Sequence, residues 1–269
     1  TTGDPYVGRI DGLADVIFES LVDTGIEESA SGALPLEDGG LLVTGTTSTG
    51  APDFESGLIA IRLGPDGMPI WTETYAGTGN ITAPVEANLN GFRITSIFFT
   101  GTGGGGLFHL DIDEGGVLVP NSAMQIAGID ATDFQVLDDG SYTYGGNRTN
   151  ETTFEAEGFA GRIDADGNTI WEIDFLGSAL GAVTNPIAPR LLDDGGFIIG
   201  ASVVPEGETQ RDYYVLRTDS MGARQWEARY GGDDDESLRD VAPTPDGGFL
   251  IGGTTRSFGV EDSDLYLVK

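Results

Sequence analysis

Carboxylates dominate the chemistry that this sequence could perform, because it holds 44 acidic residues against 13 lysines and arginines, one histidine and no cysteine. Without cysteine, disulfides, thiol nucleophiles and cysteine-bound metals are excluded. The formal net charge of −31 repels nucleic acids and anionic membranes, so neither is expected as a partner. Two explanations of the charge stay open: adaptation to a salty (halophilic) medium and the binding of cations.

The densest group of carboxylates is the run Asp233, Asp234, Asp235 and Glu236. Calcium takes about six to eight oxygen ligands, several of them carboxylates, and this run could supply some of them. We therefore name these four residues as a candidate calcium site, with a solvated acidic loop as the alternative. No other cofactor is predicted.

Three Asn-x-Thr sequons begin at Asn80, Asn147 and Asn150. A sequon accepts a glycan only in an exported chain and in a host that has the machinery. All three fall in segments that we expect to be loops on one face, so they are predicted glycosylation sites. The sequence shows neither a long apolar run nor a basic leader, and we expect a mature or excised product located outside the cell or on its surface.

The elements that position these residues repeat at intervals of about 50 residues, which is the range of propeller blades. In the clearest repeats a basic residue is followed by a tryptophan in the next predicted strand, as in Arg62 and Trp71. The basic position is occupied in turn by Arg9, Arg62, His109, Arg162, Arg217 and Lys269. His109 therefore has a place that the repeat explains, which argues against a catalytic histidine.

A second marker is an Asp-Gly or Asn-Gly turn followed by a run rich in Val, Ile, Phe and Tyr. These turns begin at Asp38, Asn90, Asp139, Asp194 and Asp246. Glycine supplies the positive φ that tight hairpins need, and the flanking runs are typical of strands. Each repeat thus contains four short strands: one before the turn, one after it, one ending at the basic residue and one carrying the aromatic residue. No helical periodicity is present.

These repeats resemble those of secreted prokaryotic β-propeller proteins, with units of the pattern DGGFLIGGTT…DLYLVK…DG…W…YGG, distantly similar to the PQQ-like superfamily. Residues 245–269 and 159–177 carry the resemblance best. It implies an all-β propeller of five four-stranded blades, each of ~52 residues, in a single domain spanning 1–269. It implies no PQQ site, because no set of residues matches the pocket that binds that cofactor.

The strand count is uneven, because the chain begins with a third and a fourth strand and ends with a first, second and third. We expect the fourth strand, Val16–Leu21, to lie beside Leu265–Lys269, and a fourth strand of the second complete repeat near Val119. One third strand is then surplus: Tyr6–Ile10, or Leu265–Lys269 if the N-terminal pair takes its place. The surplus strand is exchanged with a neighbouring copy through strand pairing, or the chain is a fragment, or residues 1–11 form a loose or bulged appendage.

No catalytic constellation stands out. A glycosidase would need paired carboxylates, and the predicted innermost strands offer only Glu86, Asp133 and Asp240. We therefore predict a non-enzymatic extracellular structural or interaction protein that self-assembles through terminal strand pairing, into filaments or a surface layer. Its expected partners are other copies of itself, or surface glycans or proteins. The alternatives are a ligand- or glycan-binding module and a carboxylate-pair glycosidase.

Overall fold

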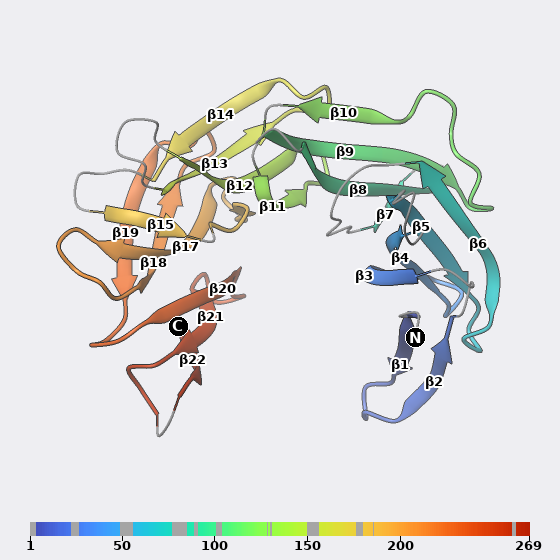
Figure 1. Ribbon diagram of the computed structural model, residues 1–269, viewed down its shortest axis with the longest axis horizontal. Coiled ribbons are helices and arrows are strands. Elements are labelled where there is room, and N and C mark those ends of the chain that lie inside the picture. Colours follow the sequence, from blue (N-terminus) through green and yellow to red (C-terminus); the bar gives the residue numbers. More distant parts are fainter. Residues whose placement is uncertain are drawn as a thin grey trace. The chain divides into compact units, whose positions relative to one another are not determined.

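The computed structural model describes residues 4–22, 27–48, 56–76, 85–88, 91–100, 104–127, 129, 131–149, 156–175, 180–184, 186–259 and 262–269. These residues form 22 strands in six separate sheets and contain no helix, which confirms the all-β prediction (Figure 1). A helix able to cross a membrane is therefore not found in them. The chain divides into two compact units, 1–129 and 130–269.

The first unit contains a hairpin and two four-stranded antiparallel sheets. The hairpin consists of β1 (Tyr6–Ile10) and β2 (Val16–Leu21). One sheet has the order β3 (Glu27–Pro35), β4 (Leu41–Ser48), β5 (Ser56–Leu63) and β6 (Pro69–Ala76). The other has the order β7 (Val85–Asn88), β8 (Gly91–Thr100), β9 (Gly104–Asp113) and β10 (Met124–Ala127).

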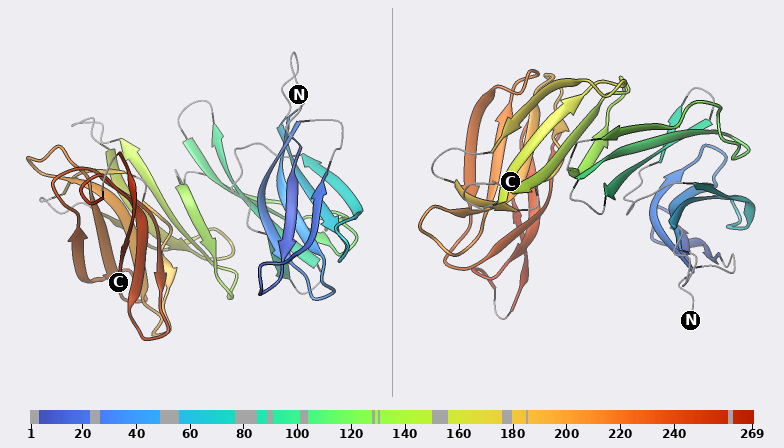
Figure 2. Two further views of the ribbon diagram at one scale, coloured as in Figure 1. Left: turned by 90° about the horizontal axis from the view of Figure 1, so that it is seen from below. Right: turned by 45° about the horizontal axis from the view of Figure 1, so that its top comes forward.

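The second unit contains three antiparallel sheets of four, five and three strands (Figure 2). The four-stranded sheet comprises β11 (Ala131–Val136), β12 (Tyr142–Thr149), β13 (Ala156–Ile163) and β14 (Thr169–Asp174). In the five-stranded sheet, β15 (Leu180–Thr184) and β16 (Arg190–Leu191) both pair with β17 (Phe197–Pro205), which is followed by β18 (Asp212–Thr218) and β19 (Arg224–Tyr230). The three-stranded sheet comprises β20 (Glu236–Pro243), β21 (Phe249–Thr255) and β22 (Asp264–Val268).

The predicted Asp-Gly turns close the hairpins between the first and second strands. Gly39 adopts a φ of 88°, and the Asp38 carboxylate accepts a hydrogen bond from the Gly40 N–H at 2.9 Å. A side chain at Gly39 would be strained in this region of φ, so the dipeptide fixes the turn. The same glycine conformation recurs at Gly140, Gly195 and Gly247.

The N-terminal hairpin repeats the pairing of the third and fourth strands elsewhere. Arg9 lies opposite Phe18, as Arg62 lies opposite Trp71 and Arg217 opposite Trp226, and a register irregularity follows each time. β1 and β2 coincide with the strands expected at the N-terminus.

The prediction of a strand near Val119 is wrong, because residues 114–123 form an extended turn and the strand that pairs with β9 begins only at Met124. The Asp113 carboxylate accepts the backbone N–H groups of Gly115 and Val117, both at 2.9 Å. Ser122 then accepts a hydrogen bond from the Asp111 N–H at 2.9 Å, which holds the returning segment. Asp164 and Asp219 make the same two carboxylate bonds in other repeats. The feature that displaces the strand is therefore a second turn, in which Ser122 bonds to the Val119 carbonyl oxygen just after Leu118 forms a bridge with Ile112.

The basic residue of the third strand pairs with the aspartate of the hairpin turn in the same sheet. These pairs are Arg62–Asp38, Arg162–Asp139, Arg217–Asp194 and Lys269–Asp246. Hydrogen bonds from Lys269 and Thr244 lower the pKa of Asp246 to about 2. Because the carboxylates are more than half exposed, these pairs align the turn with the third strand more than they stabilise it.

In two of the sheets, an aromatic residue of the fourth strand, β6 or β14, packs against a glycine turn of the next sheet. A Cβ added to Gly116 would lie 3.0 Å from the Trp71 ring, and one added to Gly222 would lie 2.9 Å from Trp171. Phe18 of the N-terminal hairpin meets Gly67 in the same way, at 2.5 Å. Each of these glycines also has a positive φ, so both space and backbone geometry exclude a side chain.

We predict that Gly222→Ala destabilises the protein by about 2–4 kcal/mol, because it adds a clash with Trp171 to the strain of the positive φ. Gly247→Ala is the matched control: its φ is +80°, against +78° at Gly222, but nothing lies within 4 Å of the added Cβ. It should cost only the backbone strain, roughly 1 kcal/mol. Equal losses in urea unfolding would show that the ring contact contributes nothing.

Candidate functional site

Two of the three acids predicted on the innermost strands come together at one arginine in the second unit. Nη2 of Arg190 lies 3.5 Å from Oδ2 of Asp133 and 3.1 Å from Oδ1 of Asp240. The three residues come from β11, β16 and β20, each of which precedes the Asp-Gly turn of a different sheet. We call these three strands the first-side strands, and Asp133, Arg190 and Asp240 the Arg190 cluster. Glu86 lies in β7, with its side chain outside the described part of the structure.

Backbone hydrogen bonds hold both carboxylates of the Arg190 cluster in place. The Ala188 N–H donates to Oδ2 of Asp133, and the Val241 N–H donates to Oδ1 of Asp240, each at 2.9 Å. The Asp133 side chain is 34% exposed and that of Asp240 is 64% exposed, so a ligand can reach both. The cluster therefore presents fixed, ionised acceptors and a guanidinium donor to solvent.

Sequence reasoning missed Arg190, although the repeat contains a signal for it. Asp133 and Asp240 precede the turn residues Asp139 and Asp246 by the same number of positions, and Ala188 has that place in the intervening repeat. Equivalent positions in successive sheets lie on the same side of a repeat fold. Arg190 follows Ala188 on the same face of an extended chain, between the two acids.

A second candidate is a cavity of about 760 Å³ in the first unit, beside Trp71. Its lining includes Leu36, Glu37, Asp38, Arg62, Ile70, Trp71, Phe92 and Glu114. The Trp71 indole N–H donates to the Glu114 carbonyl oxygen at 3.0 Å, which fixes the ring. This volume and this mixture of apolar and charged side chains are typical of small-molecule sites.

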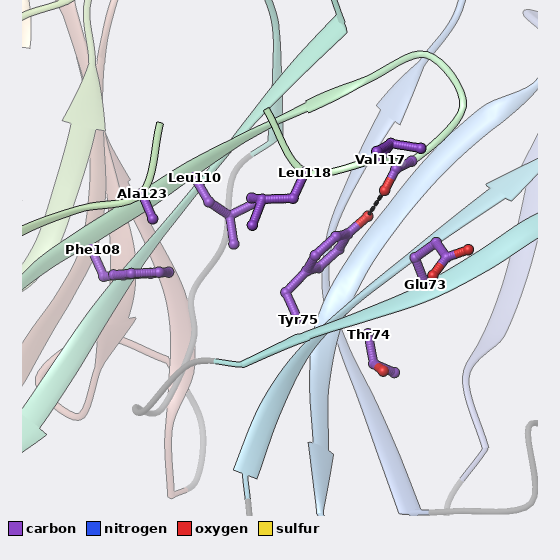
Figure 3. A pocket seen from close by; sticks show the side chains of 9 residues that line it. Glu73, Thr74, Tyr75, Phe108, Leu110, Val117, Leu118 and Ala123 are labelled. Carbon is purple, nitrogen blue, oxygen red and sulfur yellow. Dashed lines mark hydrogen bonds between the residues drawn. The ribbon is translucent and has the colours of Figure 1, made fainter. Parts of the chain in front are cut away.

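A neighbouring cavity of about 400 Å³ lies farther along β6, around Tyr75 (Figure 3). The Tyr75 hydroxyl donates to the Gly116 carbonyl oxygen at 2.7 Å, and burial raises the pKa of Tyr75. Phe108, Leu110 and Leu118 form an apolar wall, with Glu73 at one side. This cavity lacks the convergent polar groups that a specific site needs.

A third hollow, of about 340 Å³, lies on the outer face of the three-stranded sheet, next to Leu250, Leu265 and Leu267. These leucines are 40%, 74% and 55% exposed. The opposite face of the sheet buries Leu238, Val241 and Ile251 in a core with β17 and β18 residues. The hollow has the character of a packing surface, and we assign no ligand to it.

The predicted calcium residues are held by protein contacts. Glu236 is buried and accepts hydrogen bonds from the Gly232 N–H at 3.0 Å and from the Thr255 hydroxyl at 2.6 Å. Oδ1 of Asp235 accepts the Arg211 N–H at 3.0 Å. Asp233 and Asp234 are exposed. Within the described segments no three such side chains are placed to share a metal ion, and calcium binding stays a prediction.

Of the predicted glycosylation sites, the structure describes one. Asn147 lies in β12 opposite Gly158 and is half-buried, so the expectation that this sequon begins in a loop is wrong: the strand extends past it to Thr149. Asn80 and Asn150 lie outside the described residues. Use of the three sequons stays a prediction.

His109 lies in β9 with only 5% of its surface exposed, close to the Arg93–Asp111 ion pair. Burial, and then the Arg93 guanidinium, lower its pKa to about 4, against the opposing effect of Asp111. The imidazole is therefore neutral at pH 7 and enclosed in the sheet, which fits a structural role.

Comparisons with known proteins support the fold. No protein-family model and no curated protein matches the sequence. A protein of unknown function from Dyadobacter fermentans is similar in structure, with a TM-score of 0.52 at 11% identity over 85% of this chain and 76% of that one. An acylaminoacyl peptidase from Pyrococcus horikoshii also has a TM-score of 0.52, at 11% identity over 90% of this chain but 38% of the peptidase. The similarity supports a propeller-like all-β fold.

The comparisons also correct the prediction of a non-enzymatic structural or interaction protein. The similar structures include enzymes, among them the peptidase and an endo-arabinase from Bacteroides thetaiotaomicron. The arabinase has a TM-score of 0.44 at 12% identity, over 91% of this chain and 95% of its own. The alternatives of a glycan-binding module or a carboxylate-pair glycosidase are favoured over the first prediction. The residues of the Arg190 cluster come together only once the sheets are packed, so the sequence alone does not show them as a group.

We predict that the buried His109 makes the protein acid-sensitive. An unfolded histidine takes up its proton near pH 6.5, but the folded one does so only near pH 4. The neutral form thus favours folding above pH 6.5, and this advantage is lost as the pH falls from about 6.5 to about 4. His109→Gln should remove roughly 2–3 kcal/mol of the stability change over that interval.

The check is the free energy of unfolding in urea at pH 7 and pH 4.5 for both proteins. Comparing the two pH values cancels the packing cost of the substitution. Because the sequence has one histidine, no other imidazole contributes to the difference. An identical pH dependence in both proteins would contradict the prediction.

Proposed function

We propose that this protein binds a neutral glycan at the Arg190 cluster. The observation that carries the proposal is that Asp133 and Asp240, from different sheets, approach the same nitrogen of Arg190 and remain open to solvent. Sugar hydroxyls are both donors and acceptors, so they suit a site that combines fixed carboxylates with a guanidinium. Charge-assisted hydrogen bonds of this kind are about twice as strong as neutral ones.

The charge of the chain supports a neutral ligand. With a formal net charge of −31, the protein repels acidic polysaccharides at moderate ionic strength. A neutral glycan experiences no such repulsion, and its hydroxyls can donate charge-assisted hydrogen bonds to the carboxylates. This selects neutral over acidic glycans without naming the sugar.

The finer architecture is part of the proposal. Repeats of ~52 residues and sheets of mainly four strands support a five-bladed propeller, in which the first-side strands that carry the Arg190 cluster would be innermost. A position outside the cell or on its surface, where glycans are abundant, also remains a proposal.

Binding is tested by calorimetric titration with neutral tetrasaccharides of xylose, arabinose, galactose and glucose. At least one should bind, and Asp133→Asn and Asp240→Asn should each weaken it by about tenfold, as expected for loss of a charged hydrogen bond. Asp194→Asn is the matched control, since it removes an Arg–Asp pair that shares no residue with the cluster and whose carboxylate is 57% exposed, close to the 64% of Asp240. Unchanged affinity in both cluster variants would refute the site.

Hydrolysis of the bound glycan is a second candidate, favoured by the closeness of the two carboxylates. Glycosidases hold their carboxyl groups about 5–9.5 Å apart, and two oxygens at 3.5 and 3.1 Å from one nitrogen cannot exceed this range. An ionised Asp133 or Asp240 could serve as base or nucleophile.

An assay for new reducing ends separates binding from hydrolysis. If the chain is a glycosidase, the same tetrasaccharides should be cleaved, and Asp240→Asn should lower the rate by at least about 100-fold. Binding without cleavage would favour a glycan-binding module over a glycosidase. The prediction that the chain is not an enzyme stays open until this measurement.

A further inference from the structure

The cavity beside Trp71 has features that the proposed glycan site does not use. It lies in the first unit, whereas the Arg190 cluster lies in the second. Trp71 and Phe92 supply aromatic surface, and the carboxylates of Glu37, Asp38 and Glu114 line the same space. Among the described residues of the lining, Arg62 is the one basic side chain, and it is paired with Asp38. The cavity therefore carries a negative excess next to an indole ring.

We infer that this cavity binds a small organic cation of the alkylammonium class. The face of an indole ring attracts an ammonium group, more strongly when water is partly excluded. Glu37 and Glu114 add charge complementarity, and the apolar side chains of Leu36 and Ile70 suit the alkyl part of such a ligand.

Protein contacts already fix the position of the Trp71 indole ring beside the cavity. Its N–H donates to the Glu114 carbonyl oxygen at 3.0 Å, and its six-membered ring is packed against Gly116. Little rotational freedom remains to be lost on binding, which favours affinity. The same hydrogen bond holds the backbone of Glu114 at the ring, and Glu114 also lines the cavity.

Trp171, which has the same repeat position in the second unit, shows how the surroundings of Trp71 differ. Trp171 is only 6% exposed, and its ring lies 5.2 Å from that of Phe197, so the equivalent space is filled. The turn that Trp171 meets carries Ser220 and Met221, where the turn at Trp71 carries Glu114 and Gly115. Glutamate in place of serine adds negative charge to the turn at Trp71.

The test is calorimetric titration with choline and with 3,3-dimethyl-1-butanol, which has the same shape but no charge. We expect choline to bind at least about tenfold more tightly than the alcohol, and to weaken as salt is raised. Trp71→Leu should reduce choline affinity by about tenfold. Trp226→Leu is the matched control, because this exposed tryptophan has the equivalent position in another sheet.

Glu114→Gln is a second variant, since this exposed side chain can change without loss of packing. It should weaken choline severalfold and leave the alcohol unaffected. Equal binding of the two compounds, or full affinity in both Trp71→Leu and Glu114→Gln, would overturn the inference. Asp133→Asn should leave choline binding unchanged, so failure of the glycan proposal and failure of this one are distinguishable.

Discussion

The contact between an aromatic ring and a glycine turn is the constraint on which the packing of successive sheets depends. Phe18, Trp71 and Trp171 each press against a turn of the next sheet, where a Cβ would lie within about 3 Å of the ring. Because the same glycine has a positive φ, the turn and the contact are specified by one residue. A sheet packed in this way buries its second and third strands on both faces, as at Leu42, Ile59 and Ile61.

Both candidate sites follow from this packing. The ring of Trp171 packs against that of Phe197. Trp71 instead lines an open cavity together with Glu114 and Gly115 of the turn that it meets, and this cavity is acidic. On the first-side strands, the same stacking places Asp133 and Asp240 around Arg190. The repeat therefore sets the positions, and substitutions within it decide which positions carry chemistry.

Local signals made most of the strands predictable, whereas long-range signals were needed for the sites. Asp-Gly turns and β-branched runs identify β1, β2 and β4 within a residue or two, because both act on neighbouring residues. The strand expected near Val119 was misplaced because a second turn, held by hydrogen bonds between Ser122 and the Val119 carbonyl oxygen, delays it to Met124. Arg190 lies far in sequence from both of its acids, so only packing could reveal the cluster.

The most direct test of the aromatic–glycine contact is acrylamide quenching of single-tryptophan proteins, in which the other two tryptophans are replaced by phenylalanine. Trp171 is 6% exposed against its glycine turn, whereas Trp226 is 39% exposed. The account predicts blue-shifted emission and weak quenching for Trp171, with red-shifted emission and strong quenching for Trp226. Equal quenching of the two residues would contradict it.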